Sequence, residues 1–252
     1  MIPAELERIL TEKCVYTPQG QARALHSAIW LEDAQALHDL VLARAPSTVL
    51  EVGMAYGVSS LAIVSALEEL GSGSLLSLDP SQSTDWESVG CETLRRAGLS
   101  HRHTLIEEPD FSALPRMCSD SVCVDFVYID GWHTFDYTLL DLFYADKLLS
   151  VGGVVGINDG GFAAVAKALR WFTSHRRYRE LDVGLPVRLG PPVHGTDNLV
   201  RKVARKVARP SLRLVSRHAP RLAVGPLFAR FEDRYFEKRE NWEPSGVFYS
   251  SF

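Results

Sequence analysis

The feature that most constrains the fold is a regular alternation of short apolar runs and helical stretches between Ser47 and Val183. Each cycle takes roughly 25 to 35 residues, which suits a strand followed by a crossover helix. We expect strands at 48–52, 74–79, 103–107, 124–130, 153–159 and 178–183, with helices at 57–70, 85–97, 110–118, 134–149 and 161–174. This alternation predicts an α/β fold with a mostly parallel sheet and helices on both faces.

Segments of different character flank this core. Residues 1–46 carry two helical patterns and are expected to form a helical cap, and residues 47–184 form the core itself. Residues 185–245 are expected to be a Gly/Pro-rich and basic insertion, and residues 246–252, GVFYSSF, have the composition of a last strand. The length of 252 residues and the 46% hydrophobic content are typical of one globular domain.

The cysteines and the amino-terminal residues bear on the cellular compartment. The four cysteines, Cys14, Cys91, Cys118 and Cys123, form no CxxC pair and have no zinc-like spacing to histidines. Residues 1–10, MIPAELERIL, lack the basic and apolar regions of a signal peptide, and we find no transmembrane segment. These observations predict a reduced, cytoplasmic protein.

Charge is distributed unevenly along the chain. The formal net charge of −4 combines 27 Lys and Arg with 31 acidic residues, and nine of the 27 lie between Arg201 and Arg230 without one acidic neighbour. The rest of the chain therefore carries 18 cations against 31 acids, a net charge of −13. Residues 199–231 could contact an anionic membrane or protein partner, pack on the acidic body as a lid or dimer arm, bind an anionic substrate or form a solvated insertion. Nucleic acid is disfavoured as a partner because no RNA-binding signature accompanies the charge.

Two features after the first two strands indicate a nucleoside site. Gly53 and Gly57 follow the first strand and open the first helix, where the backbone can approach a ligand closely. Ala55 stands where a dinucleotide fingerprint needs its second glycine, which disfavours a nicotinamide cofactor, and the P-loop pattern is missing. Asp79 ends the second strand, where a carboxylate can accept hydrogen bonds from ribose hydroxyls. The ligand expected is a nucleoside without a diphosphate.

Four motifs resemble the class I S-adenosylmethionine (SAM)-dependent methyltransferases, especially the catechol/caffeoyl-CoA and macrocin-type small-molecule O-methyltransferases. They are LEVGMAYGVSS, LLSLDPS, VDFVYIDGWH and LLSVGGVVGIND. The resemblance covers roughly residues 20–184. It implies a Rossmann-like, seven-stranded sheet whose last strand is antiparallel.

The resemblance also implies roles for individual residues. Glu51, Gly53 and Gly57 would shape the cofactor loop, and Ser59 would meet the methionine carboxylate of SAM. Asp79 would hold the ribose, and Glu107 would border the adenine, although a solvated acidic loop is an equal explanation for Glu107.

Polar residues also follow the fourth and fifth expected strands. Asp130, Asn158 and Asp159 are expected at one sheet edge, where their oxygens could hold Mg²⁺. His133 could act as the general base, or it could merely cap a helix. Asp130 could serve catalysis, the metal or the cofactor. The Asn-Asp order departs from the Asp-Asn pair of catechol-type relatives, so both a metal-assisted and a metal-free reaction remain open.

The sequence thus predicts a SAM-dependent O-methyltransferase that acts on a hydroxylated small molecule, a sugar or a secondary metabolite. The alternative is a catalytically silent nucleoside-binding or scaffold protein that uses its basic arm for membrane or partner attachment. A homo-oligomer is compatible with either hypothesis.

Overall fold

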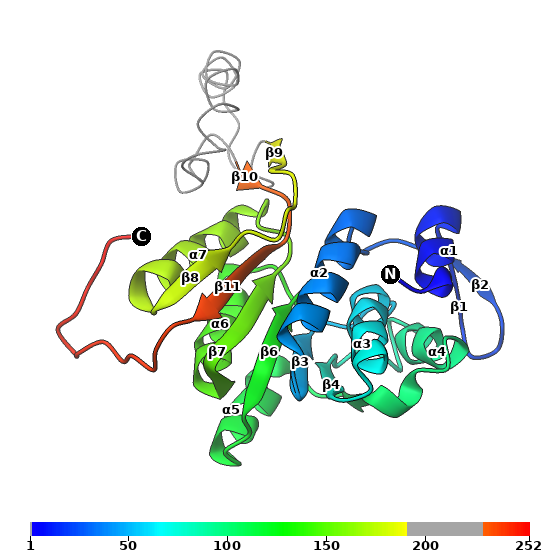
Figure 1. Ribbon diagram of the computed structural model, residues 1–252, viewed down its shortest axis with the longest axis horizontal. Helices are drawn as coiled ribbons and strands as arrows, with labels where there is room; N and C mark the ends of the chain where they lie inside the picture. Colours follow the sequence, from blue (N-terminus) through cyan, green and yellow to red (C-terminus); the bar gives the residue numbers. More distant parts are fainter. Residues whose placement is uncertain (1, 191–228) are drawn as a thin grey trace.

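The computed structural model describes residues 2–190 and 229–252. A seven-stranded sheet has the order β5-β4-β3-β6-β7-β11-β8, and β11 alone runs antiparallel to its neighbours (Figure 1). The sheet strands are β3 (Thr48–Val52), β4 (Ser74–Leu78), β5 (His103–Ile106), β6 (Val124–Ile129), β7 (Leu149–Ile157), β8 (Tyr178–Leu181) and β11 (Arg234–Lys238). The helices are α1 (Ala4–Glu12), α2 (Leu31–Arg44), α3 (Val58–Leu70), α4 (Val89–Arg96), α5 (Asp110–Ser119), α6 (Phe135–Leu148) and α7 (Ala163–His175), with a 3₁₀ turn at Ser100–Arg102. The predicted fold class is confirmed.

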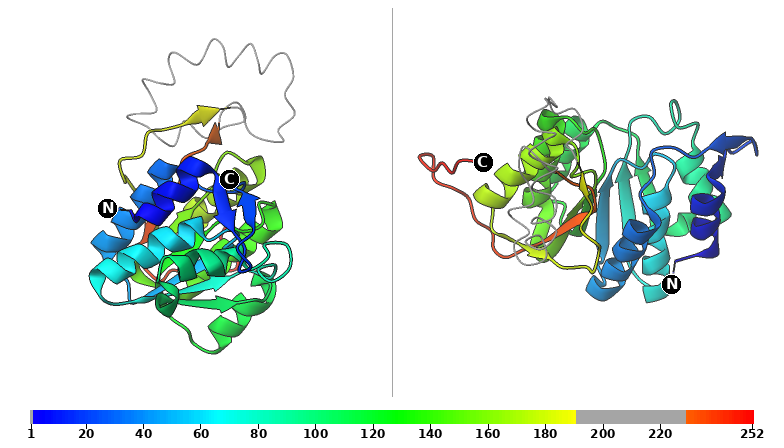
Figure 2. Two further views of the ribbon diagram at one scale, coloured as in Figure 1. Left: turned by 90° about the vertical axis from the view of Figure 1, so that its right-hand side faces the viewer. Right: turned by 90° about the horizontal axis from the view of Figure 1, so that it is seen from above.

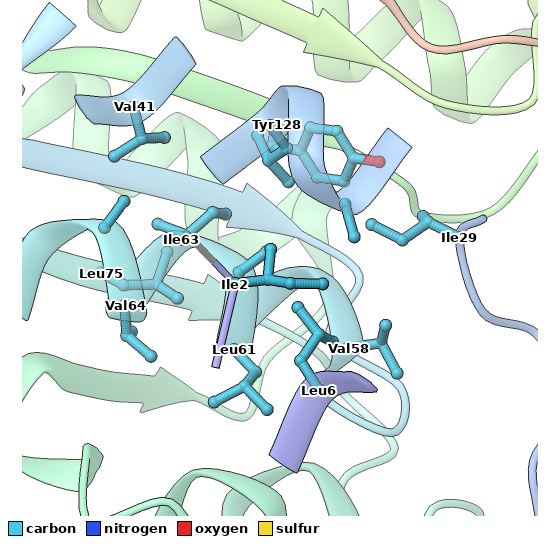
Figure 3. Packing of buried hydrophobic residues seen from close by; sticks show 14 of the residues in the cluster. Ile2, Leu6, Ile29, Val41, Val58, Leu61, Ile63, Val64, Leu75 and Tyr128 are labelled. Carbon is cyan, nitrogen blue, oxygen red and sulfur yellow. The ribbon is translucent and has the colours of Figure 1, made fainter. Parts of the chain in front are cut away.

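Alternating side chains divide the interior into two apolar layers. Val49 and Phe126 pack with α1–α4 on one face, whereas Leu50 and Val127 pack with α5–α7 on the other. Figure 3 shows the first layer, in which Leu6, Val41, Leu61 and Tyr128 gather from four different elements. Both faces of the sheet are therefore covered, as the apolar strand runs require.

The strand order places a crevice at the centre of the sheet. The chain adds β4 and β5 on one side of β3 and then crosses to form β6 on the other side. At such a switch point the loops leaving neighbouring strands diverge, and ligands bind outside the carboxyl ends of the strands. The loops after β3 and β6 are thus in place for a ligand site.

The last strand of the sheet is β11, Arg234–Lys238, so the prediction of a strand at 246–252 is wrong. Tyr235 and Phe236 are buried between β7 and β8, whereas Val247 is 94% exposed and forms no strand. Three of the five residues of β11 are charged, which hides its strand character in the sequence. The antiparallel strand thus lies inside the range assigned to the insertion.

The flanking segments add two small hairpins. Between α1 and α2, β1 (Cys14–Tyr16) pairs with β2 (Ala22–Ala24), a hairpin that the helical cap prediction did not include. Figure 2 shows this hairpin and α1 at the end of the molecule opposite the C-terminus. β9 (Leu189–Gly190) pairs with β10 (Ala229–Arg230).

Most of the basic segment, residues 199–228, lies outside the described residues. Arg230 is its one described cation, and it is buried and paired with Glu180 and Glu232. Within 2–190 and 229–252, no helix combines the length and the apolar character needed to cross a bilayer.

Candidate active site

The loop between β3 and α3 can be formed only by glycines at two positions. Gly53 has a φ of +88°, and a Cβ there would lie 2.2 Å from the carbonyl oxygen of Asp130. Gly57 has a φ of +75°, and its Cβ would lie 2.8 Å from the carbonyl oxygen of Gly90. Because side chains are excluded at both points, the loop after β3 lies directly against the loop after β6 at Gly53 and against α4 at Gly57.

Asp79 organises this loop from the end of β4. Its Oδ2 accepts hydrogen bonds from the backbone N–H groups of Met54 at 3.1 Å and Ala55 at 2.8 Å, and from the Gln82 amide at 3.1 Å. Its Oδ1 accepts one from the Ser81 N–H at 2.9 Å, which leaves acceptor capacity on that oxygen. Asp79, which is predicted to bind the ribose, therefore also holds the glycine loop in place.

A cavity of about 440 Å³ opens beside these two loops. Three of the residues expected to bind the cofactor, Gly53, Asp79 and Asp130, line it. The remaining lining is rich in aromatic side chains and was not anticipated from the sequence. It comprises Val52, Ala55, Leu78, Pro80, Ser81, Asp85, Trp86, Pro109, Asp110, Phe111, Gly131, Trp132 and Tyr137.

Glu51 and Ser59 lie beneath the loop, outside the lining of this cavity. The buried Glu51 carboxylate accepts hydrogen bonds from the hydroxyls of Ser59, Ser60 and Ser77 at 2.5–2.7 Å. Burial raises the pKa of Glu51 to about 7, although the three hydroxyl hydrogen bonds oppose that shift. Glu51 thus links the first turn of α3 to β4, while Ser59 contacts Glu51 and does not line the cavity.

Glu107 also lies outside the cavity lining. Its Oε1 accepts a hydrogen bond from the Ser83 N–H at 2.6 Å, and this bond lowers the pKa of the carboxyl. Ser83 belongs to the loop that carries the cavity residues Ser81 and Trp86. Glu107 therefore borders the site through that loop.

Asp130, His133 and Asp159 converge at the ends of β6 and β7. The His133 Nε2 lies 3.4 Å from Asp130 Oδ1 and 3.2 Å from Asp159 Oδ2, and donor atoms of the three groups lie within 4.8 Å of one another. Phe162 stacks on the His133 ring at a centroid distance of 4.9 Å. Because Asp130 also lines the large cavity, the cluster directly adjoins the expected cofactor space.

The mutual contacts tune the three groups. Burial favours the neutral form of His133, but the close contact with Asp130 and the charges of both carboxylates outweigh it and raise the pKa of the imidazole. Burial raises the pKa of Asp130 and of Asp159, although the neighbouring histidine opposes both shifts. The site therefore holds an imidazole that retains its proton to a higher pH than free histidine does.

Asn158 does not join this cluster, contrary to the expected ligand set of Asp130, Asn158 and Asp159. Its Nδ2 donates a hydrogen bond to Asp233 Oδ1 at 2.6 Å in the interior. Asp159 has a φ of +55°, and its side chain reaches His133. The three groups that come together are Asp130, His133 and Asp159, so His133, and not Asn158 as expected, is the third potential metal ligand.

Known relatives share the central part of the chain. Residues 50–160 match the family model described as a methyltransferase domain. The O-methyltransferase hkm8 of Aspergillus hancockii is 27% identical over 168 residues, which cover 66% of this chain and 62% of that protein. Caffeoyl-CoA O-methyltransferase 2 of Petunia hybrida is 26% identical over 135 residues, which cover 51% of this chain and 52% of that protein. The chain thus spans less than two thirds of the length of these curated relatives.

Solved structures share the fold over most of the chain. The O-methyltransferase TomG from Streptomyces achromogenes, solved with SAM, aligns with a TM-score of 0.57 and 16% identity over 84% of this chain and 82% of its own. An O-methyltransferase from Bacillus cereus, solved with S-adenosylhomocysteine (SAH), gives a TM-score of 0.59 and 14% identity over 94% and 91% of the two chains. With the methyltransferase-domain match, the motifs after β3, β4, β6 and β7 and this strand order, the chain is similar to the class I SAM-dependent methyltransferases.

Proposed function

We propose that the chain binds SAM in the cavity beside β3 and β4 and transfers its methyl group to a hydroxyl of a small molecule. The observation that carries this proposal is the position of Asp130, which belongs both to the cavity lining and to the cluster with His133 and Asp159. The proposed cofactor cavity therefore lies next to His133, a group that can accept a proton. Methyl transfer to oxygen requires this arrangement, because the acceptor hydroxyl must lose its proton near the methyl donor.

The cavity of about 440 Å³, with polar groups at Asp79 and Asp130 and aromatic walls, supports the proposal that SAM binds there. Asp79 and the Gly53 loop would hold SAM, because Asp79 Oδ1 can accept a further hydrogen bond. Trp86, Phe111 and Trp132 offer apolar surface to a nucleoside. SAM supplies an electrophilic methyl group. The residues of this chain orient the ligand and exclude water around it.

The cluster also fits a divalent cation, with two carboxylates and one imidazole as donors. Asp130 and Asp159 would hold such an ion, which would lower the pKa of a bound hydroxyl. Without an ion, His133 accepts the hydroxyl proton itself, with Asp130 and Asp159 stabilising the imidazolium that forms.

The test measures SAM binding by isothermal titration calorimetry and SAH formation with two acceptor probes, caffeate and dTDP-rhamnose. Binding together with SAH formation that depends on an acceptor supports the proposal. Binding without transfer to any hydroxyl favours the catalytically silent alternative, and no binding overturns both. Loss of transfer in EDTA and recovery with Mg²⁺ assigns a role to the metal, whereas unchanged transfer shows that the hydroxyl is deprotonated without one.

A further inference from the structure

The side chains of Asn158 and Asp159 contact different parts of the protein although the two residues are adjacent in the chain. Asn158 Nδ2 donates to the buried Asp233, whereas Asp159 Oδ2 lies 3.2 Å from His133 Nε2. The Asp159 backbone is in the left-handed region, with a φ of +55°, which is unfavourable for a residue with a Cβ. Such a conformation persists where surrounding contacts hold it. The hydrogen bond of Asn158, one residue earlier, is one such contact.

Asp233 contacts both strands that lead into the cluster. It is 2% exposed, and its Oδ2 accepts hydrogen bonds from the Tyr128 hydroxyl at 2.7 Å and the Tyr235 hydroxyl at 3.1 Å. Tyr128 lies on β6, two residues before Asp130, and Asn158 follows β7, one residue before Asp159. One carboxylate therefore ties together the two strand ends that carry the cluster.

Asp233 is itself held in place from another part of the chain. Its backbone N–H donates to Oδ1 of the fully buried Asp33, 3.2 Å away in the first turn of α2. Asp33 Oδ2 in turn accepts a hydrogen bond from Arg188 Nη1 at 2.5 Å. The backbone N–H of Phe231 donates to the Arg188 carbonyl at 3.0 Å. Asp233 is thus held by Asp33, which is itself hydrogen-bonded to Arg188. A residue that positions others must be fixed in this way.

We propose that Asp233 is a positioning residue, which holds the Asn158 amide in the interior and thereby fixes the Asp159 carboxylate against His133. The effect of this contact on catalysis depends on the proposed methyl transfer, whereas its effect on geometry does not. The contact also accounts for the Asn-Asp order after β7. An aspartate at position 158 would replace the donating amide by a second carboxyl group against Asp233, and two carboxyl groups so close in the interior cannot both be ionised without strong repulsion.

The test exchanges the two partners. Asn158→Asp places two carboxylates together, and we expect kcat to fall by about 10- to 100-fold because Asp159 loses its orientation. KM for SAM should not change, because Asp79 and Gly53 are untouched. Asn158→Asp combined with Asp233→Asn restores an amide–carboxylate hydrogen bond with reversed polarity, so most of the lost kcat should return. Asp233→Asn alone is expected to lie between the wild type and Asn158→Asp.

Tyr235→Phe is the matched control, because it removes one hydroxyl from Asp233 and leaves Asn158 in contact. We expect wild-type kcat for this variant. Melting temperatures identify any variant that fails to fold. A folded Asn158→Asp variant with wild-type kcat, or a double variant no better than Asn158→Asp, would overturn the proposal.

Crystal structures of Asn158→Asp and of the double variant test the geometry without any substrate. The separation of His133 Nε2 and Asp159 Oδ2 should increase in the single variant and return to about its wild-type value in the double variant. An unchanged separation in Asn158→Asp refutes positioning by Asp233, even if the protein proves to be an active methyltransferase. If wild type binds no SAM, the proposed function fails while this structural comparison still decides the role of Asp233.

Discussion

At the scale of single residues, Asp79 supports the glycine loop and is proposed to hold the ribose of SAM, and one substitution can test the proposal. Its carboxylate accepts two backbone hydrogen bonds from the glycine loop and keeps one oxygen partly available for a ligand. We expect Asp79→Ala to lower SAM affinity at least about tenfold, since each hydrogen bond to a charged acceptor contributes about 1.5–3 kcal/mol. Calorimetric titration measures this loss. Glu107→Ala should weaken SAM binding less, because Glu107 meets the site only through Ser83. Unchanged affinity in a folded Asp79→Ala variant would contradict the ribose assignment.

His133 determines how the rate should depend on pH. As a general base it must be neutral, and its pKa is raised above the ordinary value of 6.5, so protonation suppresses the reaction up to that raised pKa. We expect kcat to rise with pH through a limb above pH 6.5. His133→Ala should lower kcat by about 10²-fold and abolish that limb. A stable His133→Ala variant with wild-type turnover would leave only a structural role for the imidazole.

Asp141 is a buried carboxyl group whose two oxygens have no hydrogen-bond partner within residues 2–190 and 229–252. Burial, reinforced by the charge of Asp110, raises its pKa well above the ordinary value of 3.8. The folded state therefore binds this proton more tightly than the unfolded state does. The resulting stabilisation is complete below pH 3.8 and is lost as pH rises toward the folded pKa.

Replacement of Asp141 by asparagine removes this pH dependence. We expect Asp141→Asn to be more stable than wild type by about 1–3 kcal/mol at pH 7, with a smaller difference at pH 4. Urea unfolding at the two pH values measures both free energies. Equal differences at pH 4 and pH 7 would show that Asp141 does not titrate in this range.

At the scale of elements, the sequence predicts the structure best where buried strands are mostly apolar. β3 and β6 match their expected ranges to within one residue and β7 overlaps its expected range, because apolar layers cover both faces. β11 could not be predicted from its composition, because Arg234 and Glu237 pair with charges on other elements. The terminal run at 246–252 has more strand-like residues but no neighbouring strand.

The same limit applies to the site. Asp79, Asp130, His133 and Asp159 each end a strand or follow one closely, so position alone identifies them. The binding partner of Asn158, Asp233, is 75 residues away in sequence, and only the tertiary structure brings the two together. The aromatic lining of the cavity likewise comes from separate loops.

The two candidates for the last strand can be compared directly. Phe236 is buried and packs edge-on against Phe172, so Phe236→Ala should destabilise the protein by about 3–5 kcal/mol. Deletion of residues 246–252 removes exposed chain and some ring contacts to His175, and should cost much less while SAM binding remains. Urea unfolding and calorimetry measure the two effects. A larger loss from the deletion would restore 246–252 as an essential part of the fold.

At the scale of the whole molecule, charge separation predicts association with anionic surfaces. Of the nine cations between Arg201 and Arg230, Arg230 is paired in the interior, and the other eight lie outside the described residues. Each cation near an anionic membrane contributes about 1 kcal/mol, and salt screens this attraction over about 8 Å at physiological ionic strength. We therefore expect phosphatidylserine vesicles to retain the protein at low salt and to release it as salt is added.

Co-sedimentation with neutral phosphatidylcholine vesicles is the control for this charge effect. Replacement of Arg205, Lys206, Arg209 and Arg213 by glutamine should remove most of the binding to anionic vesicles. It halves the number of cations between Arg201 and Arg221 from eight to four. The acidic remainder of the chain cannot substitute for them, since it is repelled by the same lipid. Equal retention by anionic and neutral vesicles at low salt would exclude a lipid surface. The cations would then contact the acidic remainder of this chain or of a second copy. In the first case the same glutamine variant should change the stability, and in the second case it should change the oligomeric state.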